Sequence, residues 1–151
     1  MTYDARLIEL GIELPPPALP VASYIPTVQV GALLFVSGQV GFENGQVMAG
    51  RVGDVRDLDY AIRAARACGL MIVSQIKAHV GSLDRVDRFV KLGAFVNSVP
   101  TFTDQPKAAN GASDLIHEIF GEAGRHTRSA VGVSSLPFGA TIEIDAVVAI
   151  V

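Results

Sequence analysis

Hydrophobic residues recur along the chain with two different periods, which predict different elements. From Leu58 to Val80 the apolar positions follow steps of three and four residues, which places them on one face of an α-helix. An aspartate within residues 54–57 is suited to cap its start. A second helix is predicted to open at Thr103–Pro106 and to end at a glycine within residues 121–124, because proline suits the first turn and glycine the end of a helix.

Other segments are rich in apolar residues and bounded by glycine, proline or asparagine, which is typical of strands. Leu33 to Ser37 is an apolar run of the kind found in strands buried on both faces. Asn44-Gly45 predicts a type I′ hairpin, because both central residues of that turn need a positive φ. The strands expected are 24–30, 33–37, 46–51, 85–97, 127–135 and 141–151.

The predicted order of elements is βββαβαββ. This order indicates an α+β fold in which a mixed six-stranded sheet carries both helices on one face. Residues 1–151 are expected to form a single domain, since about 100 to 200 residues usually make one. Residues 1–20 form an N-terminal extension in this interpretation, with a short helix within Thr2–Leu10 and a proline-rich strap from Leu14 to Pro20.

Composition indicates a surface that other subunits cover in part. Hydrophobic residues make up 50% of the chain and charged residues only 18%, against about 25% in typical globular proteins. We therefore expect a homo-oligomer that covers the sheet face opposite the helices. The net charge of −3, without any run of basic residues, argues against nucleic-acid binding as the main role.

Residues 14–42 contain no charged residue, which raises the question of a membrane segment. Five prolines and the polar residues Ser37–Gln39 interrupt this stretch, so buried strands of a soluble protein are predicted instead. The N-terminus lacks the basic and then apolar stretch of a signal peptide, and Cys68 has no second cysteine to pair with. A cytoplasmic protein without a membrane partner is expected.

The standard signatures of nucleotide, zinc and redox chemistry are missing from the sequence. His79, His117 and His126 lie in separate segments without the spacing of metal ligands, so no metal is expected. Cys68 falls near the apolar side of the first long helix, where an inert buried thiol is the expectation. Ser37 lacks the GxSxG elbow of a serine hydrolase.

Arg128 and Glu143 carry more chemistry than these residues. Arg128 begins an apolar strand with small neighbours, so its guanidinium can project into a cleft and hold a carboxylate with two hydrogen bonds. Glu143, an acid among apolar residues, could hold a water or a proton. A surface ion pair for Arg128 and a structural salt bridge for Glu143 are open alternatives. Strand parity does not decide whether Arg125 or Arg128 faces the cleft, since one extra residue near His126 reverses the faces.

The segments Leu33–Gln39, Val90–Asn97 and, above all, Arg128-Ser129 with the later Leu136-Pro137 and Ile142–Ile144 are similar to those of a known family. The sequence resembles the reactive intermediate deaminase A (RidA) family, also labelled endoribonuclease L-PSP, from about residue 20 to residue 150. The spacing from Arg128 to Glu143 matches that family without a gap. The chain looks like a longer, divergent branch of it.

The resemblance implies a chorismate-mutase-like subunit that assembles as a homotrimer with clefts between neighbouring subunits. It also implies cofactor-free hydrolysis of reactive 2-imino or enamine acids to 2-keto acids and ammonia, on a small carboxylate-bearing metabolite. Arg128 would bind the substrate carboxylate, and Glu143 would orient or activate the attacking water. The residues that the resemblance places around the substrate are Tyr24, Ser37, Gly38, Asn110 and Ala130.

Four positions depart from the family pattern. Ala130 stands where a cysteine is usual, Gly132 where an acid is common, and His126-Thr127 replaces a usual Pro-Ala pair. These changes leave a second hypothesis open, a non-catalytic module of the same fold that binds small carboxylates or regulates. A ribonuclease, which the older family label suggests, is disfavoured by the net charge of −3 and the aromatic content of 7%.

Overall fold

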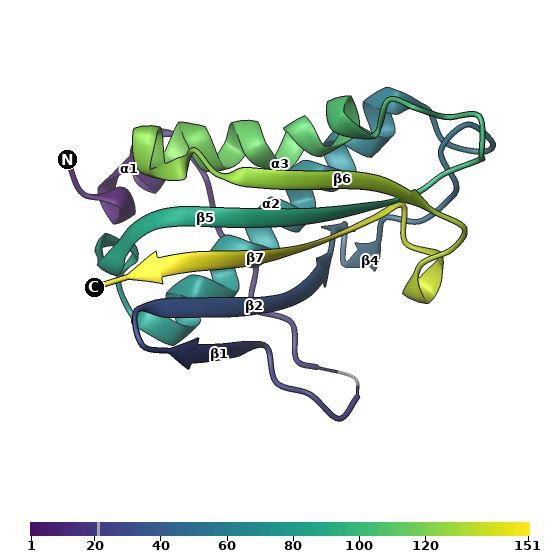
Figure 1. The fold of residues 1–151 in the computed structure, drawn as a ribbon. Helices are drawn as coiled ribbons and strands as arrows, with labels where there is room; N and C mark the ends of the chain where they lie inside the picture. Colours follow the sequence, from purple (N-terminus) through teal and green to yellow (C-terminus); the bar gives the residue numbers. More distant parts are fainter. Residues whose placement is uncertain (21) are drawn as a thin grey trace.

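Five strands form the main sheet, and two long helices cover one of its faces (Figure 1). The computed structural model describes residues 1–20 and 22–151. The strand order is β1-β2-β7-β5-β6, and all neighbours are antiparallel except β5 and β6, which are parallel. The strands span Thr27–Val30 (β1), Leu33–Val40 (β2), Val86–Asn97 (β5), Thr127–Val133 (β6) and Ile142–Ile150 (β7).

The two long helices begin where the sequence predicts. In α2 (Leu58–Val80), the Asp57 carboxylate caps the first turn by accepting from the Tyr60 backbone N–H at 2.9 Å. In α3 (Gln105–Phe120), Pro106 occupies the first turn. Both helices lie on the same side of the sheet (Figure 1), which confirms the predicted α+β class. Short 3₁₀ turns lie after α2 at Leu83–Arg85 (η1), after α3 at Gly121–Gly124 (η2) and after β6 at Pro137–Gly139 (η3).

The expectation of a sixth strand in the main sheet is wrong. Residues 46–51 supply only a short strand, β4 (Gln46–Val47), which pairs with β3 (Phe42–Glu43) in a separate hairpin around the predicted Asn44-Gly45 turn. Beyond it, backbone N–H groups donate to three different segments, at the carbonyls of Gly41, Gly139 and Asn97. Because these partners change from residue to residue, no continuous ladder forms.

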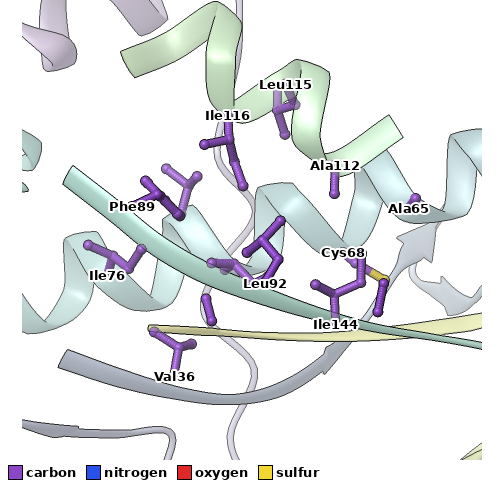
Figure 2. Close-up of a cluster of buried hydrophobic side chains, with 14 of the residues drawn as sticks. Val36, Ala65, Cys68, Ile76, Phe89, Leu92, Ala112, Leu115, Ile116 and Ile144 are labelled. Atoms are coloured by element: carbon purple, nitrogen blue, oxygen red, sulfur yellow. The ribbon is translucent and has the colours of Figure 1, made fainter. Parts of the chain in front are cut away.

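The hydrophobic core lies between the sheet and the two helices. Burial alternates along β7, with Ile142, Ile144 and Val148 buried toward the helices and Glu143 and Asp145 half-buried on the other face. Figure 2 shows the labelled side chains of the strands and of α2 and α3 meeting in this layer. This alternation decides which face each candidate site residue occupies.

The N-terminal residues pack against the helices. The helix α1 (Tyr3–Glu9) is held by Asp4, whose carboxylate accepts from Ser82 Oγ at 2.7 Å and from Lys77 Nζ at 3.0 Å. The proline-rich segment that follows has no regular structure and crosses α2, where Gln75 donates to the Ala18 carbonyl at 2.8 Å. Ser74 Oγ likewise donates to a carbonyl of this strap, at residue 15.

The sheet face opposite the helices exposes apolar side chains. Val28 and Phe35 are direct cross-strand partners and are 46% and 45% exposed, and Val131 on β6 is 47% exposed. Isolated exposed apolar residues are ordinary, but neighbours on one face form a patch that favours association. In the part of the chain that the structure describes, no helix has the length and apolar character needed to cross a membrane.

Candidate functional site

Arg128 lies at the start of the edge strand β6 and reaches across to α3. Its register partner on β5 is Leu92, which is buried toward the helices, so Arg128 points to the helix side as well. On α3, Pro106, Asn110 and Ser113 follow at steps of four and three and therefore share one face. The guanidinium Nη1 donates to Asn110 Oδ1 at 2.9 Å and to Ser113 Oγ at 3.0 Å, and Nη2 donates to the Pro106 carbonyl at 3.1 Å.

These three hydrogen bonds leave two N–H donors of the guanidinium available for a ligand. An arginine side chain carries five N–H donors. Within residues 1–20 and 22–151, the Nε–H and one Nη2–H of Arg128 have no hydrogen-bond partner. Two remaining donors match the two oxygens of a carboxylate. The site therefore fits a carboxylate held by a guanidinium whose other edge is fixed to a helix.

His126 completes this cluster, because its ring bridges Ser113 and the backbone. Its Nδ1 lies 2.6 Å from the Gly124 carbonyl and its Nε2 lies 2.9 Å from Ser113 Oγ. Burial lowers the pKa of His126, the bond to Gly124 opposes this, and the Arg128 charge lowers it further. The net lowering of the pKa favours the neutral ring.

Arg125 and Arg128 line the same cleft, of about 640 Å³, with Asp114 and His117. Their surroundings differ. Arg125 pairs with Glu122 at 3.0 Å, and its side chain is 64% exposed. Arg128 instead is fixed by three groups of α3. Of the two arginines, Arg128 is the one whose orientation the fold sets.

Glu143 lies beside a bulge in the neighbouring strand, on the sheet face away from the helices. The pairing of β2 with β7 shifts between Val36 and Gln39, which leaves Gly38 in the bulge. A Cβ added at Gly38 would lie 2.5 Å from Glu143 Oε2, so only glycine permits this approach. Burial, and then the charge of Asp145, raise the pKa of Glu143. A carboxyl with a raised pKa takes up a proton more readily than an ordinary glutamate, which suits it to proton exchange.

The cleft beside Glu143 has a volume of about 580 Å³ and is mostly apolar. Tyr24 and Gly38 line it, and their contact with a substrate stays a prediction. The strap contributes residues 18–20, and η3 contributes Phe138, which is 65% exposed and has a positive φ of 61°. Such a backbone conformation is costly for an aromatic residue and is found at constrained sites.

Ser37 and Ala130 line neither of these two clefts. Ser37 Oγ donates to the Ile25 carbonyl at 2.8 Å, so it fixes the segment that carries Tyr24. Ala130 is half-buried against the core, on the same face as Arg128. Their proposed contact with substrate therefore stays a prediction.

The two clusters lie on opposite faces of the sheet. Phe95 is the register partner of both Glu143 on β7 and Val131 on β6, so Glu143 projects to the face away from the helices. Arg128 projects toward the helices and is three residues distant from Val131 along β6. One small substrate cannot contact both side chains of the same copy. A site that uses both needs a second copy of the chain.

Sequence reasoning missed Ser113, His126 and Phe138 as site residues. The signal for Ser113 was its spacing from Asn110 on a predicted helix, and His126 precedes Arg128 by two residues, the period of one strand face. In residues 1–20 and 22–151, the structure shows no group of three or more His, Cys, Asp or Glu that could hold a metal. Burial, with the Glu143 charge, raises the pKa of the Cys68 thiol, which makes it a poor nucleophile.

Comparison with known families gives a match over residues 4–145 to the model described as "YjgF/chorismate_mutase-like, putative endoribonuclease". The chain belongs to this family. Its members include the RidA and L-PSP proteins that the sequence resembles, and the recognition of that family from sequence is confirmed.

Relatives within the YjgF/chorismate mutase-like family carry different names. A Trypanosoma cruzi protein named TCP17 is 52% identical, with 95% of this chain and 91% of that protein covered. A Dermatophagoides farinae protein named 2-iminobutanoate/2-iminopropanoate deaminase is 31% identical over 87% of this chain and 88% of its own length. A crystal structure of an Agrobacterium tumefaciens protein of unknown function is 46% identical, with a TM-score of 0.91 and coverage of 99% and 92%.

Proposed function

We propose that the protein hydrolyses reactive 2-imino or enamine acids to 2-keto acids and ammonia without a cofactor, in clefts that two copies share. The observation that carries this proposal is the Arg128 guanidinium, which three acceptors on α3 fix while two N–H donors stay free for a carboxylate. Membership of the family and the name of the Dermatophagoides farinae relative support the reaction class.

The chemistry needs little more than placement. A protonated imine is already electrophilic, so the enzyme has to hold the substrate carboxylate and direct a water at the imine carbon. The Glu143 carboxylate accepts a proton as the water oxygen bonds to that carbon. It then returns the proton to the amine. As the carbon–nitrogen bond breaks, the Glu143 carboxylate takes the hydroxyl proton and the carbonyl forms, so the products are a 2-keto acid and ammonia, which leaves with that proton as ammonium. The raised pKa of Glu143 suits these proton transfers.

The assembly proposed is a homotrimer in which Arg128 of one copy and Glu143 of the next face the same cleft. Two observations support a shared site: the two side chains lie on opposite faces of one copy, and the open sheet face carries exposed apolar residues. Cyclic assemblies of identical subunits repeat one interface, so each copy contributes to two sites.

The test is keto acid release from imines that an added threonine dehydratase generates, with wild-type protein and with Arg128→Ala. We expect acceleration by the wild type and a roughly 100-fold loss of kcat/KM in the variant, since two charge-assisted hydrogen bonds of about 1.5 kcal/mol each are removed. Arg125→Ala is the matched control and should retain most activity. Failure of the wild type with several amino acid precursors would contradict the proposal.

A second candidate function is a non-catalytic module that binds small carboxylates. It is favoured by Ala130, which stands where the family usually has a cysteine and here packs against the core. Calorimetry distinguishes the two. Binding of 2-oxobutanoate that depends on Arg128, in a protein that hydrolyses no imine, would establish the second function instead of the first.

A further inference from the structure

Arg128, Ser113, His126 and Gly124 form one continuous chain of hydrogen bonds behind the carboxylate site. We propose that His126 is a positioning residue: through Ser113 it holds the Arg128 guanidinium in its binding orientation, and a carboxylate bound at Arg128 favours protonation of His126. This inference rests on the proposed role of Arg128 as the carboxylate ligand. It concerns residues that replace the usual Pro-Ala pair and so goes beyond the family resemblance.

The direction of every bond in the chain is fixed by chemistry. A carbonyl oxygen only accepts, so the contact with Gly124 requires the proton on Nδ1 of His126. The neutral ring then has an acceptor at Nε2, and Ser113 Oγ–H donates to it. An arginine only donates, so Ser113 Oγ accepts from Arg128 Nη1 with a remaining lone pair. Each group therefore has a partner of the matching kind.

His126 determines where the Ser113 hydroxyl points. A serine inside a helix can turn its O–H to the carbonyl four residues earlier, which competes with other bonds. The acceptor on His126 draws that proton away from α3 and presents a lone pair of Ser113 to Arg128. Because Gly124 packs directly on α3, where an added Cβ would lie 2.6 Å from the Ile116 carbonyl, the bond between His126 and Gly124 is itself fixed to the helix.

The charges around His126 set the sign of its response to ligand. Arg128 comes from β6, Asp114 and His117 come from α3, and Arg125, paired with Glu122, lies at the cleft edge. Arg88 of β5 contacts only the backbone there, at the Arg125 carbonyl. Of these, Arg128 is the charge that lowers the pKa of His126. A carboxylate on Arg128 offsets that charge and raises the pKa of His126, so by linkage the carboxylate binds more tightly as the pH falls through that pKa. The protonated ring donates from Nε2 to Ser113 Oγ, which still accepts from Arg128 with its other lone pair while its own O–H turns to the helix carbonyl four residues earlier, so the chain to Arg128 persists.

The first experiment follows the histidine rings of the wild-type protein by NMR over a pH series, with and without saturating 2-oxobutanoate. We expect the pKa of His126 to rise by about half a unit or more with ligand. His79 is the internal control, because it contacts Thr27 and Gln29 on β1, and its ring signals should not respond to the ligand. An unchanged His126 pKa in a protein that binds 2-oxobutanoate through Arg128 would overturn the inference.

The second experiment measures affinity for 2-oxobutanoate in four variants. His126→Leu and Ser113→Ala each break the chain and should weaken binding about tenfold, the effect of one lost hydrogen bond to a charged group. His126→Gln and Ser113→Thr keep an acceptor and a hydroxyl and should stay within about twofold. His126→Gln should also lose the tightening at low pH, since an amide does not titrate. In turnover, the loss should appear in KM, with kcat nearly unchanged.

Arg128→Ala separates the two proposals. If it leaves carboxylate binding intact, Arg128 is not the ligand and the proposed function fails. If it abolishes binding while His126→Leu and Ser113→Ala bind as the wild type does, the proposed function stands and the positioning role of His126 is wrong.

Discussion

Gly38 and Glu143 show how one missing side chain defines the environment of a carboxylate. The bulge in β2 brings the Gly38 backbone so close to Glu143 that a Cβ would lie 2.5 Å from Oε2. The same relation recurs one strand away, where a Cβ on Gly93 would lie 2.5 Å from Asp145 Oδ1. Both acids lie on the sheet face away from the helices, but only Glu143 lines the apolar cleft.

Gly38→Ala is therefore expected to displace the Glu143 carboxylate and to lower keto acid formation at least about tenfold, while the flexible glutamate limits the loss of stability. Gly93→Ala is the matched control, since it meets Asp145 in the same way. Steady-state kinetics and thermal unfolding of both variants check this. Equal losses of activity in the two would contradict a special role for the contact between Gly38 and Glu143.

Glu143→Gln is expected to abolish hydrolysis and to raise stability above pH 7. The pKa of Glu143 is raised in the folded state, mainly by burial, so the folded protein disfavours the ionised form. The wild type therefore loses stability as the pH rises through the unfolded and then the folded pKa of this group. Below both values the carboxyl is neutral, as glutamine is. Melting temperatures should differ at pH 8 and converge near pH 3, and a variant that is less stable at pH 8 would refute this.

At the scale of elements, the N-terminal segments tie distant parts of the chain together. Burial alone would raise the pKa of Asp4, but hydrogen bonds from Ser82 and Lys77, the Lys77 charge and the Leu83 backbone lower it. One carboxylate thereby joins α1 to the end of α2 and to η1. The strap that follows then reaches the cleft beside Glu143.

Asp4→Asn is expected to cost about 1 kcal/mol of unfolding free energy at pH 7, because the carboxylate bonds are lost. A carboxyl with a lowered folded pKa contributes stability above its unfolded pKa of about 3.8 and loses it as the pH falls through the folded value. The difference between variant and wild type should therefore shrink near pH 3 in urea unfolding. Glu9→Gln, which removes only an exposed pair with Arg6, should have little effect at either pH.

The strap and η3 are expected to select substrates with large apolar side chains, because residues 18–20 and Phe138 line the cleft beside Glu143. Phe138→Ala should lower kcat/KM more for the imine derived from phenylalanine than for that derived from alanine, by roughly tenfold. Ile8→Ala, on the exposed surface of α1, is the control. Equal effects on both imines would show that the substrate side chain does not contact Phe138.

Most elements follow from the sequence, because long periodic segments and caps are local signals. The helix 58–80 and the Asn44-Gly45 turn are of this kind, and both are present as predicted. The end of β4 at Val47 is not local, since it depends on which distant carbonyls accept from the residues after it. The faces of Arg128 and Glu143 likewise depend on register across β5, which no single segment specifies.

For the whole molecule, the decisive geometry is the division of the candidate site between two sheet faces. Arg128 belongs to a polar cluster on α3, whereas Glu143 belongs to an apolar cleft on the other side. The exposed apolar residues of the open face, including Val28 and Phe35, are available to join copies. In this proposal association completes the site as well as covering the face.

Mixing Arg128→Ala and Glu143→Gln subunits tests this division directly. Each variant alone should be inactive, but every mixed trimer would contain one site with both intact residues. Random assembly of equal amounts should therefore recover roughly a quarter of wild-type activity. The measurement is keto acid release after denaturation and refolding of the mixture, with separately refolded proteins as the control. No recovery in mixtures shown to contain mixed oligomers would contradict a shared site.

The placement of Arg128 and Glu143 on opposite faces also has a genetic consequence. In the proposed trimer, a copy that carries both substitutions would inactivate the two sites to which it contributes, although its two partners are normal. In a cell that makes normal and doubly altered chains together, the defective allele would thus be partly dominant. The fraction of active sites lost would exceed the fraction of chains that are altered.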